Sequence, residues 1–132
     1  MTMAVGVLLI THDGIGSAHR AVAERLLGNL PLAVGVFEMH FDMLPEDALV
    51  DASAALRKVD SGDGVLLLTD LYGASPSRLA QRVAKLGTPV HRVSGLALPM
   101  LLRVLNHAES DLDELARIAT SGARNGVVVD DA

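Results

Sequence analysis

The chain has 132 residues, of which 50% are hydrophobic, and it carries a formal net charge of -5 with no cysteine. This length suits one ordinary domain with a substantial core, so we expect residues 1–132 to form a single domain. The lack of cysteine excludes disulfides, thiolate metal sites and cysteine nucleophiles. A negative net charge with only 2% aromatic residues argues against nucleic acid as a partner.

The hydrophobic segments also bear on where the protein is located. None is long enough to cross a bilayer, and the first residues lack the basic flank and the small-residue cleavage site of a secretory signal. We therefore expect no transmembrane segment and a cytoplasmic protein.

Apolar runs alternate with amphipathic segments along the chain, and this alternation predicts strands that alternate with helices. The runs predict strands over residues 5–12, 32–39, 65–69, 90–94 and, near the C-terminal end, 127–129. Helical spacing predicts helices over 17–27, 45–59 and 75–86, and two more that begin at 99 and just after 110. Units of this length and order give a mostly parallel sheet with right-handed crossovers.

The predicted helices carry local signals on their faces and at their ends. Ser75 is expected to cap the third helix, with Pro76 at its first helical position. Ser110 and Asp113 resemble a capping box for the last helix. The expected buried face of the first helix consists of Ala18, Ala21, Val22 and Leu26.

His12 ends the first predicted strand, and Asp70 follows the third. In the common strand order 2-1-3-4 these strands are neighbours, and the topological switch point lies between them. A carboxylate that accepts the Nδ1 proton of a histidine leaves Nε2 as a free lone pair and stabilises the cation formed when Nε2 is phosphorylated. The helix that begins at Ser75 adds unpaired N–H groups and a positive dipole end, which favour a phosphoryl group. The pattern predicts a phosphohistidine site.

Each of these residues also has a purely structural interpretation. A single histidine at a strand end is usually a hydrogen-bonded structural residue, Asp70 can form an Asx turn, and Ser75 can act only as a helix cap. Their convergence on one switch point favours function for His12 and Asp70, and both roles for Ser75. The spacing of the other histidines predicts structural or solvated roles and no metal site; they are His19, His40, His91 and His107.

An alternative function comes from Gly14-Ile-Gly16, which begins like a dinucleotide-binding fingerprint. His19 stands where the third glycine is expected, and only Glu38 lies near the place of the acidic residue that follows the second strand. A small dinucleotide- or anion-binding module therefore stays open as an alternative, and tight NADH binding with an unreactive His12 would select it.

Three segments together resemble a known family. They are Val-Leu-Leu-Ile-Thr-His12, Leu-Leu-Leu-Thr-Asp70-Leu-Tyr-Gly-Ala-Ser75-Pro76 and Gly95-Leu-Ala-Leu-Pro-Met-Leu101. In order and spacing they resemble the mannose-type IIA domain of the bacterial phosphoenolpyruvate-dependent sugar phosphotransferase system, over essentially the whole chain. The pattern Asp-x-x-Gly-x-Ser-Pro is the more specific part of this similarity.

The resemblance implies a cytoplasmic phosphotransferase without a cofactor or metal. His12 would accept a phosphoryl group from the histidine-containing phosphocarrier protein and donate it to a IIB domain. Asp70 would orient His12, and Ser75 with the backbone amides of Gly73 and Ala74 would hold the phosphoryl oxygens. The implied fold is a flavodoxin-like, three-layer α/β sandwich with a parallel sheet in the order 2-1-3-4 and a short antiparallel edge strand. Residues 127–129 match that C-terminal strand, which homodimers of such domains commonly exchange.

Four positions depart from the family pattern: Asp13, Ala74, Arg78 and Ala97 stand where glycine, glycine, asparagine and asparagine are common. These changes alter the loops that would shape the docking surface, so a regulatory phosphoprotein without a dedicated sugar transporter is the alternative function. A second carboxylate beside His12 would repel a phosphoryl group, so we predict that Asp13 turns toward solvent.

Overall fold

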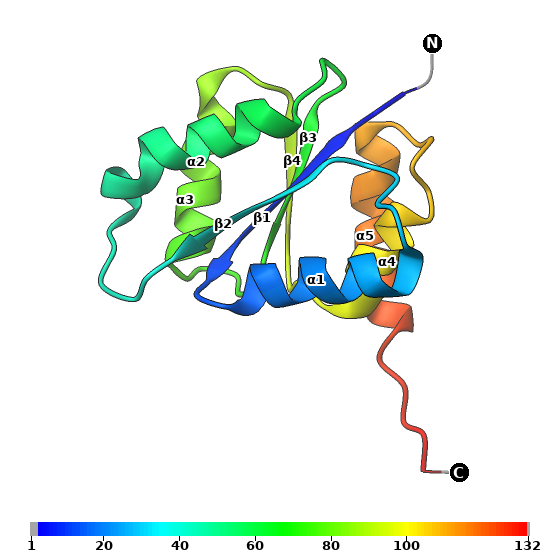
Figure 1. Ribbon diagram of the computed structural model, residues 1–132. Helices are drawn as coiled ribbons and strands as arrows, with labels where there is room; N and C mark the ends of the chain where they lie inside the picture. Colours follow the sequence, from blue (N-terminus) through cyan, green and yellow to red (C-terminus); the bar gives the residue numbers. More distant parts are fainter. Residues whose placement is uncertain (1–2, 132) are drawn as a thin grey trace.

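A sheet of four parallel strands runs through the middle of the protein in the order β2-β1-β3-β4. The computed structural model describes residues 3–131. The strands are β1 (Gly6–His12), β2 (Val34–Met39), β3 (Val65–Thr69) and β4 (Val90–Ser94), as Figure 1 shows. The predicted parallel sheet and its strand order are therefore confirmed, and the sheet places the ends of β1 and β3 side by side.

Helices cover both faces of this sheet and complete a three-layer sandwich (Figure 1). One face carries α1 (Ile15–Leu27), α4 (Leu98–Leu105) and α5 (Leu112–Asn125). The other carries α2 (Pro45–Val59) and α3 (Ser75–Val83), and α3 continues into the short 3-10 turn η1 (Ala84–Leu86). Among residues 3–131, no helix combines the length and the apolar character that crossing a membrane requires.

Successive strand residues feed two separate cores because side chains alternate between the faces of a strand. Leu9 and Leu68 pack with α1, α4 and α5, whereas Leu8 and Leu67 pack with α2 and α3. Both faces of β1 and β3 are covered, and this is why these strands are continuous apolar runs rather than alternating ones. The core thus holds the two strands whose ends carry His12 and Asp70.

The buried face of α1 differs from the predicted one. Val22 and Leu26 are 42% and 61% exposed, whereas Ala23 is fully buried. The cause is Gly16, where an added Cβ would lie 2.8 Å from Val36 Cγ1. This small residue lets α1 approach the sheet along the stripe of Gly16 and Ala23, which leaves the larger apolar residues on the outer side.

Both predicted helix caps are displaced by one residue. Ser75 is the first residue of α3, whose N-cap position is Ala74, and no side chain caps this helix. At α5 the cap is Asp111 rather than Ser110, because the Asp111 Oδ1 atom accepts the backbone N–H of Glu114 at 2.9 Å. The predictions of capping by Ser75 and Ser110 were therefore wrong, although both helices begin close to the predicted positions.

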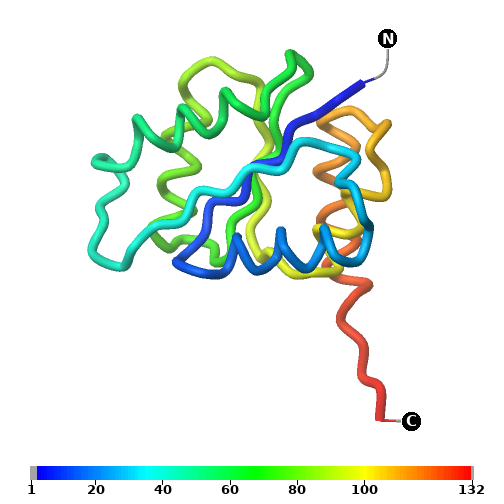
Figure 2. The backbone as a smooth tube through the Cα atoms, viewed as in Figure 1, coloured from blue at the N-terminus to red at the C-terminus, as the bar shows by residue number. Residues whose placement is uncertain are grey.

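The C-terminal segment forms no strand within residues 3–131. Val127, Val128 and Val129 are 82%, 70% and 84% exposed and lie outside every regular element. Figure 2 shows this segment leaving the body of the protein after α5. The predicted antiparallel edge strand is thus absent from the described chain, because an extended segment becomes a strand only when another strand satisfies its backbone groups.

Candidate functional site

His12 and Asp70 meet at the carboxyl edge of the sheet. His12 is the last residue of β1, and Asp70 directly follows β3, which pairs with β1. The Nδ1 atom of His12 lies 2.7 Å from Asp70 Oδ2, and the backbone N–H of His12 donates to the same oxygen at 3.1 Å. One carboxylate oxygen thus fixes both the ring and the main chain of His12.

This contact determines the form of the imidazole that faces outward. An ionised carboxylate only accepts hydrogen bonds, so His12 Nδ1 carries the proton and Nε2 of the neutral ring keeps its lone pair. The His12 side chain is 20% exposed and that of Asp70 is 8% exposed. The imidazole is therefore partly accessible at the surface while its supporting carboxylate is nearly buried.

Hydrogen bonds also fix the main chain where both strands end. Thr11 Oγ1 accepts the Gly16 N–H at 2.9 Å and donates to the His12 carbonyl oxygen at 2.8 Å. At β3, the Thr69 carbonyl oxygen accepts the N–H groups of Gly95 and Leu96, each at 2.9 Å. Buried hydroxyl and carbonyl groups with such partners hold the strand ends, and with them the site, in one arrangement.

The loop after Asp70 leads into α3 and exposes backbone N–H groups. Gly73 adopts a φ of 86°, a left-handed conformation that favours glycine. The Ala74 N–H donates to the Leu71 carbonyl oxygen at 3.3 Å, whereas the N–H groups of Gly73 and Ser75 have no backbone acceptor within residues 3–131. These free donors and the positive end of the α3 dipole make the loop suitable for an anion.

Phe41 is a site residue that sequence analysis missed. Its ring stacks on the imidazole of His12, with ring centroids 5.3 Å apart and an interplanar angle of 29°. Phe41 belongs to the loop between β2 and α2, which begins at the same edge of the sheet as the loop after β1. That placement was the only available signal, since a phenylalanine in a loop after a strand has no chemical signature of its own.

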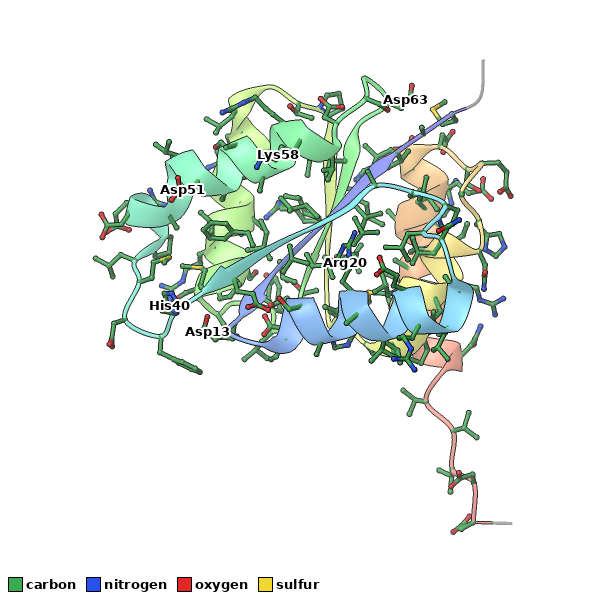
Figure 3. All side chains as sticks on the ribbon, viewed as in Figure 1. Asp13, Arg20, His40, Asp51, Lys58 and Asp63 are labelled. Atoms are coloured by element: carbon green, nitrogen blue, oxygen red, sulfur yellow. The ribbon has the colours of Figure 1, made fainter. Side chains whose placement is uncertain are left out.

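Asp13 pairs with His40 at the surface. Asp13 Oδ2 is 2.6 Å from His40 Nδ1, and Figure 3 shows the two side chains pointing toward one another. The Asp13 side chain is 43% exposed, so its predicted orientation toward solvent is confirmed. The hydrogen bond to Asp13 and the charge of Asp13 raise the pKa of His40 above 6.5. The charge of Glu38 raises this pKa further by a smaller amount. This contact with Asp13 agrees with the structural or solvated role that was predicted for His40.

Glu38 occupies the N-terminus of α1. Its Oε2 atom accepts the Ser17 N–H at 2.8 Å, and backbone hydrogen bonds, first of all this one, lower the pKa of Glu38 below 4.5 against the opposing effect of burial. A dinucleotide would need the N–H groups of this turn for its pyrophosphate. Because the carboxylate of Glu38 already takes that position, the geometry argues against the dinucleotide-binding alternative.

The remaining histidines make local contacts away from the site. His19 Nδ1 lies 2.8 Å from the Ile15 carbonyl oxygen, and His107 Nδ1 lies 2.9 Å from that of Arg103. His91 Nε2 pairs with the exposed Asp113 at 2.6 Å. Within residues 3–131, no three histidine, aspartate or glutamate side chains are grouped so that they could hold a metal ion.

Comparison with known proteins identifies the kind of domain. A family model described as the PTS system fructose IIA component, EIIA-man, matches residues 6–119. The chain is 30% identical over 127 residues to the PTS system mannose-specific EIIAB component of Escherichia coli (strain K12), an alignment that covers 95% of this chain and 39% of that protein. It is also 29% identical over 122 residues to the transcriptional regulatory protein LevR of Bacillus subtilis (strain 168), an alignment that covers 88% of this chain and 12% of that protein. The chain spans well under half the length of either relative.

Solved structures share the fold at lower identity. The mannose/sorbose specific IIA subunit of the phosphotransferase system from Enterococcus faecalis superposes with a TM-score of 0.86 at 23% identity, covering 98% of this chain and 97% of that one. The phosphotransferase system component EIIA from Streptococcus agalactiae superposes with a TM-score of 0.80 at 20% identity, covering 95% of this chain and 96% of that one. The matching family model and the relative from Escherichia coli are both described as phosphotransferase system components. Since the family match includes both strand ends that carry His12 and Asp70, the chain belongs to the mannose-type family of phosphotransferase system IIA components.

Proposed function

We propose that His12 accepts a phosphoryl group on Nε2 from the histidine-containing phosphocarrier protein and passes it to a IIB domain. The observation that carries this proposal is the 2.7 Å contact between His12 Nδ1 and Asp70 Oδ2, which leaves Nε2 free to attack. Membership of a family of IIA components supports the same chemistry. We further propose that residues 1–132 act as one IIA domain in the cytoplasm, where the phosphocarrier partners would reach it.

In the proposed transfer, the Nε2 lone pair of His12 attacks phosphorus and forms a new N–P bond. The N–P bond to the donor histidine breaks, and its electron pair returns to the donor nitrogen. His12 keeps its Nδ1 proton and becomes a phosphoimidazolium cation, which the Asp70 carboxylate stabilises across the same hydrogen bond. Alignment and charge stabilisation are sufficient for this step, so it requires no cofactor or metal.

The N-terminus of α3 supports the binding of the phosphoryl oxygens. We assign this role to the N–H groups of Gly73 and Ser75, which have no backbone acceptor within residues 3–131, and to the Ser75 hydroxyl, which caps no helix. The Ala74 N–H would have to exchange its long bond to the Leu71 carbonyl oxygen for one to the phosphoryl group. The helix dipole adds a favourable field for the negative charge that arrives with the group.

A homodimer through the C-terminal segment is also part of the proposal. Within residues 3–131, β4 pairs only with β3, so its other edge has no strand partner. Val127, Val128 and Val129 are exposed and β-branched, a residue type that favours strands. An antiparallel strand donated by a second copy would satisfy the β4 edge and bury these valines at the same time.

The proposed function is tested by incubating the protein with phosphoenolpyruvate, enzyme I and the phosphocarrier protein, followed by intact mass measurement under alkaline conditions. We expect one acid-labile phosphoryl group on the wild-type protein and on His91→Ala, whose pair with Asp113 is remote from the site. The group should be absent from His12→Ala. Phosphoryl label that persists in His12→Ala would overturn the assignment.

A further inference from the structure

Phe41 lies in an unusual environment for a large apolar side chain. Phe41 is 81% exposed, so burial of its ring contributes little to holding it in this position. Its specific partner is the imidazole of His12, on which it stacks at a centroid separation of 5.3 Å. The contact joins the proposed nucleophile to the loop between β2 and α2, for which sequence and fold alone suggest no role.

A contact between two side chains links this loop to the end of β1. His40, the residue before Phe41, contacts Asp13, the residue after His12, with 2.6 Å between Nδ1 and Oδ2 (Figure 3). The Met43 N–H donates to the His40 carbonyl oxygen at 3.0 Å and closes a turn around Phe41. Phe41 therefore stacks on His12, while the adjacent His40 pairs with the adjacent Asp13.

We propose that Phe41 is a positioning residue for phosphotransfer, clamped over the His12 imidazole by the His40–Asp13 pair. The inference rests on the proposed function of His12 and adds a specific role for the loop between β2 and α2, which that mechanism does not use.

The geometry gives a physical reason for such a residue. The hydrogen bond from Nδ1 to Asp70 fixes one atom of the imidazole but permits the ring to tilt about the axis of that bond. A flat ring stacked at 29° restricts the tilt and holds Nε2 in line with the approaching phosphorus. The aromatic face also interacts favourably with the cationic ring that phosphorylation produces.

The first test replaces the stacked ring. We compare Phe41→Leu, which keeps apolar bulk without a flat ring, with Phe41→Tyr, which restores the ring, and use Val50→Ala, an exposed apolar residue on α2, as the control. We expect Phe41→Leu to slow single-turnover phosphorylation of His12 about tenfold, and Phe41→Tyr and Val50→Ala to keep the wild-type rate. The loss should fall on the rate at saturating donor rather than on the donor concentration for half-maximal rate.

The second measurement detects the contact between Phe41 and His12 without any phosphotransfer. Ring-current effects of Phe41 should shift the carbon-bound imidazole protons of His12 in NMR spectra of the unphosphorylated protein. We expect these resonances to move toward ordinary values in Phe41→Leu and to stay in place in Phe41→Tyr. Far-UV circular dichroism and thermal melts of each variant establish that it is folded.

The third test addresses the clamp. His40→Asn, Asp13→Asn and the double variant should slow phosphorylation to a similar extent, because each removes the same contact and the effects are then not additive. His91→Asn is the matched control, since it breaks a histidine–aspartate pair of the same 2.6 Å length elsewhere on the surface.

The outcomes separate this inference from the proposed function. Wild-type labelling on His12 together with an unchanged rate and unchanged His12 resonances in Phe41→Leu would overturn the positioning role and leave the function standing. Failure to label His12 in the wild-type protein would overturn the function, while the NMR comparison would still decide whether Phe41 orients the ring. Strictly additive effects of His40→Asn and Asp13→Asn would overturn the clamp.

Discussion

Asp70 Oδ2 accepts two hydrogen bonds from His12, one from the ring at 2.7 Å and one from the backbone at 3.1 Å. The other oxygen of the same carboxylate, Oδ1, is buried without a hydrogen-bond partner within residues 3–131. Among residues 3–131, the hydrogen bonds to the Asp70 side chain thus all come from His12. This arrangement fixes the position of the strand end and the tautomer of the ring with one atom.

Asp70→Asn should preserve the shape of the site and impair its chemistry. In asparagine, the atom in the place of Oδ2 is either the NH2 group, which cannot accept the ring and backbone N–H groups of His12, or a neutral oxygen, which stabilises the phosphoimidazolium cation less than a carboxylate does. We expect the single-turnover phosphorylation rate to fall by about 100-fold or more, as found when a carboxylate that orients a catalytic histidine is replaced by its amide. Rapid-quench labelling measures the rate, with Asp51→Asn on the exposed side of α2 as the control. A variant as fast as Asp51→Asn would contradict the role of Asp70.

Thr11→Val tests whether the hydroxyl under the site stabilises the fold. Thr11 is fully buried, and valine keeps its shape but leaves the Gly16 N–H without its acceptor at 2.9 Å. A buried donor left unsatisfied costs about 1 to 3 kcal/mol, so we expect a lower free energy of unfolding by this amount in urea titrations. Thr120→Val is the control, because its hydroxyl bonds only to carbonyl oxygens within its own helix. Equal effects of the two substitutions would argue against a special role for Thr11.

The His40–Asp13 pair should make the stability of the protein depend on pH in a defined direction. Asp13 raises the pKa of His40, with a smaller contribution from Glu38, so the folded protein binds the His40 proton more tightly than the unfolded chain does. The stabilisation is complete below the unfolded pKa of about 6.5 and is lost as the pH rises through the higher folded pKa. The difference in Tm between wild type and His40→Asn should therefore shrink as the pH rises. A difference that grows with pH would contradict the assignment.

Glu38 should show the opposite dependence. Its bond to the Ser17 N–H lowers the pKa of its carboxyl group, so the charged form stabilises the fold above the ordinary pKa of 4.5 and the effect is lost as the pH falls through the folded pKa. We expect Glu38→Gln to lower the Tm at neutral pH and to approach the wild-type Tm in acid. Thermal melts from neutral to acidic pH measure this, with the exposed Glu109→Gln as the control. A difference in Tm that stays the same as the pH falls would show that the charge of Glu38 is not what stabilises α1.

The sequence contained enough to place His12 beside Asp70 but not Phe41 over His12. Strand β3 is a continuous apolar run between turn residues, and the order of its neighbours follows from general rules for parallel sheets, so the two strand ends could be brought together in advance. The position of Phe41 depends on the contact of His40 with Asp13, a pairing between two loops that no local pattern encodes. The buried face of α1 was mispredicted for a related reason. Hydrophobic spacing does not reveal that the lack of a side chain at Gly16 lets α1 approach the sheet on that side.

The exposed valines of the C-terminal segment give a prediction about assembly. Burying one valine contributes about 1.5 kcal/mol or more, and about 1.4 kcal/mol corresponds to a tenfold change in an equilibrium constant. If this segment completes the β4 edge of a second copy, Val128→Asp should raise the dimer dissociation constant at least about tenfold, and a chain that ends at Gly126 should be monomeric. Sedimentation equilibrium measures both, with Val50→Asp, at a similarly exposed position on α2, as the control. Circular dichroism of all variants should match the wild type, because Val128 lies outside both cores. A wild-type protein that stays monomeric at every concentration, or a truncated chain that still dimerises, would show that the valines serve another purpose.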